Sequence, residues 1–230
     1  MVIRSNKTTN DAKSTSAGNK LQKRHMNICY QQQANDCGHW GFRLCAEYLV
    51  DHFSLDESDR FHSWPCSKYG SNLKQNLEQF IELFPAKSSQ LSFEPRQDVY
   101  SGRQSRRTKV KSIPLDHHVV FLETILSGGV IVINLRNFDF PSDESSTIIT
   151  PSSKPSGGHT MVCINVTPDG FYVLLDANKN DGGDEYSYKD NWPIQSCIKH
   201  LPFSYTDFNI SIDSRRHHVN IYDYIVVNMY

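Results

Sequence analysis

The stretch Gln31-Gln32-Gln33-Ala34-Asn35-Asp36-Cys37-Gly38-His39-Trp40 decides the fold, because a polar run passes directly into an amphipathic segment. Asp36 suits the N-cap of a helix that is predicted to run from about Cys37 to Phe53. Cys37 then lies in the first helical turn, where backbone N–H groups and the helix dipole favour a thiolate. The apolar residues of this segment recur at helical spacing: Phe42, Cys45, Ala46, Leu49, Val50 and Phe53. The stretch therefore predicts a nucleophilic cysteine at the start of a helix.

A predicted hairpin supplies the partners of this cysteine. Residues 160–166 and 171–175 are strand-like, and the Thr-Pro-Asp-Gly turn between them is a strong hairpin signal. In an antiparallel hairpin the start of one strand lies beside the end of the other, so His159 and Asp176 are predicted neighbours. Asp176 can accept a hydrogen bond from one imidazole nitrogen while the other nitrogen faces Cys37. The three residues then act as nucleophile, base and orienting acid.

The oxyanion hole is the less defined part of the predicted site. Gln31 lies six residues before Cys37 and is the candidate to donate a side-chain N–H to the oxyanion, beside the backbone N–H of Cys37. Gln32 and Gln33 compete with Gln31, because consecutive glutamines leave the register open. Asn178 is the alternative to the aspartate as orienting residue.

The remaining patterns predict an α+β protein, with a helical layer packed against a small, largely antiparallel sheet. Apolar periodicity predicts further helices over about 72–84 and 115–127. Strands are predicted at about 91–93, 130–135, 160–166, 171–175 and 221–227, and loops at 94–114, 138–156 and 178–190. Residues 1–25 carry six lysines and arginines against one aspartate and are predicted to be a disordered basic tail. Residues 26–230 are predicted to form a single catalytic domain.

Composition restricts the partners and the compartment. The net charge of −1 gives no global attraction to nucleic acid. Neither a membrane-spanning apolar run nor a secretory signal is recognisable, so no membrane partner is expected. None of the six cysteines forms a C-x-x-C pair, which weakens a zinc interpretation, and no metal or cofactor is expected. A cytoplasmic protein, or a secreted effector that acts in a reducing cytosol, fits best.

These motifs carry a family resemblance. Gln31-x5-Cys37, with Asp36-Cys37-Gly38 and a helix ending in Glu47-Tyr48-Leu49, resembles the catalytic segment of papain-like cysteine peptidases of the C39 type. Gly158-His159 before a hydrophobic strand, with Asp176 seventeen residues later, resembles their His and Asp motifs in the same chain order. The resemblance covers about residues 28–182. It implies a papain-like fold and thiol-dependent hydrolysis of an amide bond in a protein or peptide.

The layout is also similar to that of the eukaryotic guanylyl-cyclase-domain proteins. The shared features are the Gln-x5-Cys segment, the Ser-Gly-Gly and strand unit at 127–135, a long insertion and the Gly-His pair. This similarity implies, as an alternative, a protein that handles GTP, with support from the acidic residues of loop 181–185 and the basic loop 103–111. A deamidase or a transglutaminase-type acyl transferase on the same fold is the other alternative.

Overall fold

The computed structural model describes residues 37–62, 72–96, 116–141, 146–152, 158–176, 197–208 and 218–230. Within these ranges the protein combines helices with an antiparallel sheet, which confirms the α+β class. The predicted tail and the loops at 103–111 and 178–190 lie outside the described residues. No helix in the described ranges is long and apolar enough to cross a membrane.

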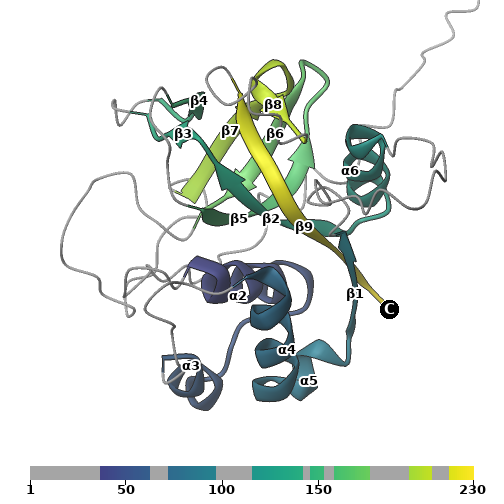
Figure 1. Cartoon of the computed structure of the whole chain (residues 1–230). Helices are drawn as coiled ribbons and strands as arrows, with labels where there is room; N and C mark the ends of the chain where they lie inside the picture. The colour runs from purple at the N-terminus through teal and green to yellow at the C-terminus, as the bar shows by residue number, and fades with distance from the viewer. Residues whose placement is uncertain are drawn as a thin grey trace, which may run out of the picture.

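The chain builds two groups of elements (Figure 1). The helices are α2 (Cys37–Leu49), α3 (Leu55–His62), α4 (Leu73–Leu83), α5 (Pro85–Ser88) and α6 (His117–Leu126). The main strands are β1 (Leu91–Arg96), β2 (Val130–Arg136), β5 (His159–Val166), β6 (Phe171–Leu175), β7 (Ile198–Pro202) and β9 (Val219–Met229). They pair antiparallel in the order β1-β9-β2-β5-β6-β7. Short elements complete the fold: the parallel partner β8 (Thr206–Asp207) of β9, the pair β3 (Phe138–Asp139) and β4 (Thr150–Pro151), and the 3-10 helix η3 (Phe203–Tyr205).

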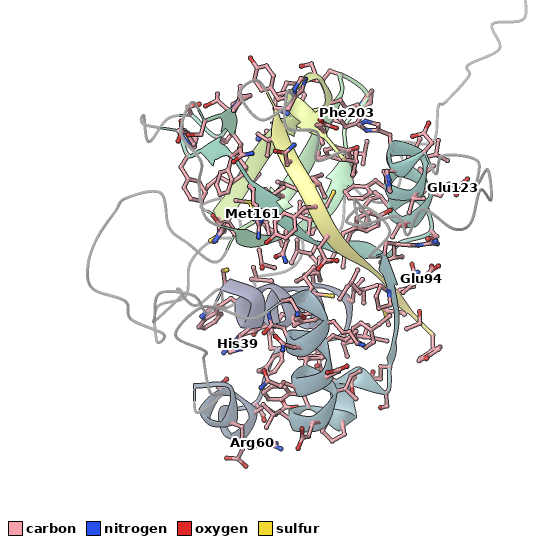
Figure 2. The ribbon with its side chains drawn as sticks, viewed as in Figure 1. His39, Arg60, Glu94, Glu123, Met161 and Phe203 are labelled. Atoms are coloured by element: carbon pink, nitrogen blue, oxygen red, sulfur yellow. The ribbon has the colours of Figure 1, made fainter. Side chains whose placement is uncertain are left out.

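Two apolar clusters pack on the opposite faces of the sheet, because strand side chains alternate between faces. One cluster joins α2 and α4 to residues such as Val132 and Val162. The other fills the space between the strands and α6, with Ile133 and Met161. Figure 1 shows α2 to α5 on one side of the sheet, and Figure 2 shows Met161 in the half of the molecule built from strands and His39 in the helical half.

The predicted helix that begins at Cys37 ends earlier than expected, at Leu49 rather than Phe53. Phe53 still packs in the helical core at 9% exposure, but it does so from a segment that is no longer helical. The apolar spacing therefore predicted the burial of Phe53 correctly but placed the end of the helix wrongly. Beyond the end of the helix the carbonyl of His52 still has a hydrogen-bond donor, because the Lys87 ammonium donates to it at 2.9 Å.

Other boundaries show the same influence of tertiary contacts. The helix predicted at 72–84 forms at Leu73–Leu83, where Asn72 and Gln75 make a capping box. The loop predicted from residue 94 begins as strand up to Arg96, because the long β9 offers pairing along its whole length. The predicted loop 138–156 likewise contains the strands β3 and β4. Strands β7 and β8 were not predicted.

The contact between α2 and β5 positions the candidate site. A Cβ on Gly41 would lie 2.7 Å from Cγ2 of Thr160, closer than real side chains approach. Glycine at this position therefore allows the helix to lie directly on the strand. This close packing brings the first turn of α2, with Cys37, to the start of β5, with His159.

Candidate active site

The imidazole of His159 donates a hydrogen bond from Nε2 to Oδ1 of Asp176 at 2.9 Å. Asp176 directly follows β6 and is fully buried, whereas His159 is 9% exposed. The predicted proximity of these two residues is confirmed. The buried carboxylate fixes the orientation of the ring and the position of its other nitrogen, Nδ1.

A β-bulge in the hairpin makes this contact possible. A regular ladder continued from the Val166–Tyr172 pair would place Asp176 opposite Val162 and would leave His159 on the face away from Asp176. The register instead shifts between Cys163 and Asn165, so that Val162 pairs with Leu175. The extra residue lies in β5, so β6 keeps its alternation and Asp176 stays on the face of Tyr172 and Leu174, whereas the shift turns His159 to that face. The prediction that the turn alone nearly fixes the register was therefore wrong by one residue.

Cys37 completes the arrangement from the start of α2. Its sulfur forms a hydrogen bond with the His159 side chain, and Nδ1 is the nitrogen left for it because Nε2 is bonded to Asp176. The thiol is half-buried and therefore reachable from solvent. Nucleophile, base and carboxylate thus form one continuous chain of contacts, although they come from three separate elements.

The electrostatics favour the ionised pair. Burial alone raises the pKa of Cys37, but the hydrogen bond and the positive charge of His159 outweigh it and leave that pKa below the ordinary thiol value. Burial lowers the pKa of His159, but the charge and hydrogen bond of Asp176 and the contact with Cys37 outweigh it and raise that pKa. The two shifts act in the same direction, toward a thiolate beside an imidazolium.

Thr160 and Asn134 support the thiol and were not singled out from the sequence. Backbone and side-chain hydrogen bonds from Thr160 reach Cys37 and lower its pKa. The Thr160 hydroxyl also donates to Oδ1 of Asn134 at 2.6 Å, across the β2–β5 pair. A polar residue directly after the candidate histidine was the only available signal, and the role of Asn134 depends on strand pairing far along the chain.

Two phenylalanines flank the imidazole of His159. The ring centroids of Phe138 and Phe140 lie 6.0 and 5.6 Å from that of His159. Phe138 is buried, whereas Phe140 is 41% exposed and forms an apolar wall next to the ring. These residues belong to the segment predicted as a loop, and they restrict the movement of the His159 ring.

Lys199 is a buried cation near the carboxylate. It lies in β7, is fully buried, and its Nζ has no hydrogen-bond partner among the described residues. Burial lowers the pKa of Lys199, while the negative charge of Asp176 opposes that shift. The lysine therefore contributes positive potential close to Asp176.

The remaining sequence-based candidates are placed as follows. Gln31, Gln32, Gln33 and Asn178 lie outside the described residues, as does the predicted N-cap Asp36. His39 is buried two residues after Cys37, and burial lowers its pKa to about 4, so it stays neutral near pH 7. No group of metal ligands occurs among the described residues.

The sequence matches no protein-family model, and no curated protein matches it. Any inference about the chemistry of the site therefore depends on the geometry of its residues. A half-buried thiol, a buried imidazole and a buried carboxylate in one hydrogen-bonded chain can activate sulfur as a nucleophile and return a proton to a leaving group.

Proposed function

We propose that this protein is a papain-like cysteine hydrolase that cleaves an amide bond in a protein or peptide substrate. The observation that carries the proposal is the chain of contacts from Cys37 through His159 to Asp176, with the pKa of the thiol lowered. The placement of these residues on different elements supports the proposal further. The nucleophile begins a helix in one part of the molecule, and the base and carboxylate come from the sheet in the other (Figure 1).

The proposed reaction has two stages. The Cys37 thiolate attacks the carbonyl carbon, a C–S bond forms, and the carbonyl oxygen becomes an oxyanion. His159 gives its proton to the leaving amine as the C–N bond breaks, which leaves a thioester. His159 then takes a proton from water, the hydroxide attacks the thioester, and the thiolate is regenerated. The oxyanion donors proposed are the backbone N–H of Cys37 and the side chain of Gln31.

The same thioester intermediate would serve acyl transfer or deamidation. An amine that replaces water as acceptor makes the protein a transferase of the transglutaminase type, and a glutamine side chain as substrate makes it a deamidase. The GTP-handling alternative depends on residues 103–111 and 181–185, which lie outside the described residues. A reducing cytosol is the compartment in which such a thiolate persists.

The pH dependence of Cys37 alkylation by iodoacetamide tests this proposal. An unperturbed cysteine has a pKa of about 8.5. Because His159 lowers the pKa of Cys37, half-maximal alkylation is expected below that pH. In His159→Ala the positive charge of the imidazolium is lost while Cys37 stays partly buried, so the alkylation midpoint is expected above about 8.5. Peptide mapping by mass spectrometry separates Cys37 from the other thiols.

Cys45→Ala is the matched control, because it removes a buried thiol from the same helix. Burial raises the pKa of Cys45, so this variant is expected to retain the alkylation profile of Cys37. A wild-type midpoint at or above about 8.5, or a midpoint unaffected by His159→Ala, contradicts the proposal.

A further inference from the structure

A second β-bulge, in β9, directs a tyrosine toward the candidate site. Asn134 of β2 pairs with Asp223, but the next residue, Leu135, pairs with Ile221. Tyr222 is therefore the extra residue of the bulge and lies outside the regular alternation of β9. Bulges of this kind re-aim a side chain and are common beside active sites.

The hydroxyl of Tyr222 lies close to the residue that precedes the candidate base. A Cβ on Gly158 would lie 2.4 Å from Oη of Tyr222, so glycine is needed for the hydroxyl to occupy this place. Burial raises the pKa of Tyr222 and outweighs the charge and hydrogen bond of Arg136, which lower it, while the negative charges of Asp223 and Cys37 add to the rise. The phenol therefore stays protonated as a hydrogen-bond donor, and it lies within electrostatic range of the sulfur.

Arg136 places a positive charge beside this hydroxyl. It ends β2, where its side chain is exposed, and its guanidinium carbon lies 4.1 Å from the centroid of the Tyr222 ring. Because alternate residues of a strand share a face, Arg136 lies on the same face of β2 as Asn134, which contacts Thr160. The arginine is thus the next group on that face of the strand, beyond the residues that support Cys37.

A stacked guanidinium is suited to bind a carboxylate. Stacking on an aromatic ring uses the flat faces of the guanidinium and leaves its N–H groups directed outward in the plane. Those groups match the two oxygens of a carboxylate, and a neighbouring phenol adds another donor. Because the Tyr222 hydroxyl lies against Gly158, directly before the candidate base, such a carboxylate would belong to the molecule that is attacked.

We propose that Arg136 and Tyr222 form a carboxylate-binding subsite beside Cys37, so that preferred substrates carry a carboxylate close to the bond that is cleaved. The statement about substrates rests on the proposed function, whereas the binding of a carboxylate beside the sulfur does not. The carboxylate of a peptide has two sources, an acidic side chain and the C-terminus, and both share this chemistry.

Two alkylating reagents that differ only in charge test the subsite. Iodoacetate carries a carboxylate and iodoacetamide an uncharged amide, and both react with the same Cys37 thiolate. The ratio of their rate constants therefore cancels any change in thiolate fraction and reports the attraction for a carboxylate. Arg136→Gln is expected to lower the ratio of the iodoacetate rate constant to the iodoacetamide rate constant by about tenfold, the effect of losing one charge-assisted hydrogen bond.

Arg60→Gln is the matched control, because Arg60 is an exposed arginine on α3, in the helical half (Figure 2). It removes the same charge and is expected to keep the wild-type ratio. Arg136→Lys keeps the charge without the planar fork and is expected to give an intermediate ratio. An unchanged ratio in Arg136→Gln, or an equal fall in Arg60→Gln, overturns the subsite. An ordinary pH profile of Cys37 would contradict the proposed function but would leave this ratio readable, so the two failures are distinguishable.

Protection from iodoacetate identifies the source of the carboxylate. One peptide carries an internal glutamate and an amidated C-terminus, and its control carries glutamine instead. A second peptide has no acidic side chain and a free C-terminus, and its control is amidated. Slower alkylation of Cys37 with one acidic peptide and not with its control supports the subsite and assigns the source. Protection by neither peptide overturns the proposed substrate class.

Discussion

Cys37→Ala is expected to lower kcat/KM for hydrolysis of a pool of fluorogenic peptide amides by about 10³-fold or more, because removal of the nucleophile of a catalytic triad leaves only binding and oxyanion contributions. His159→Ala is expected to cause a loss of similar order, since the thiolate then lacks the imidazolium that stabilises it and the leaving amine lacks its proton donor. The loss in the double variant is expected to be no greater than in Cys37→Ala, because the two groups act as one unit. Release of fluorophore is the measurement.

Cys45→Ala provides the comparison for this experiment, because it deletes a thiol about two turns further along α2 without touching the site. Its hydrolysis rate is expected to match that of the wild type. Turnover that survives Cys37→Ala would assign the reaction to another group and exclude the covalent mechanism.

The second large effect is expected from Asp176→Asn, which should reduce kcat/KM by about 10²- to 10⁴-fold. The amide has nearly the same shape as the carboxylate but carries no charge, so the pKa of His159 falls and the imidazolium form becomes less populated. The thiolate of Cys37 then loses part of its stabilisation. The pH midpoint of Cys37 alkylation is therefore expected to move upward in this variant, in parallel with the loss of hydrolysis.

Two further experiments distinguish a lost orientation of His159 from a lost fold. Thermal unfolding followed by circular dichroism shows whether Asp176→Asn keeps the fold, which is a necessary check because this residue is fully buried. Asn178→Ala tests the alternative orienting residue and is expected to retain activity. A severe loss in Asn178→Ala, with near-normal activity in Asp176→Asn, would reverse the assignment.

The hairpin shows how far local sequence determines the site. The Thr-Pro-Asp-Gly turn and the strands on either side were predictable, since turn chemistry and alternation are local properties. The bulge between Cys163 and Asn165 was not, because it satisfies the burial of residues on both faces of a sheet with other partners. That bulge turns His159 to the face of Asp176, so the sequence predicted the proximity of the two residues without the reason for it.

The residues that reach the candidate site from distant strands could not be predicted from the sequence. Asn134, Lys199 and Tyr222 approach the site through the strand order β9-β2-β5-β6-β7, which no local pattern encodes. Cys37, by contrast, was predictable from a polar run followed by helical periodicity. The helix end was misplaced because Phe53 is buried from a non-helical segment, and apolar spacing reports burial rather than backbone conformation.

The central claim is that Cys37 carries the acyl group during turnover, and acid-quenched mass spectrometry tests it most directly. With p-nitrophenyl acetate as a small acyl donor, the wild-type protein is expected to acquire one acetyl group on Cys37 in the first turnover and to lose it to water in the steady state. In His159→Ala both acetylation and its loss should be slow. Steady product formation without acetyl on Cys37, or acetylation and deacetylation that proceed equally fast in His159→Ala, would contradict the mechanism.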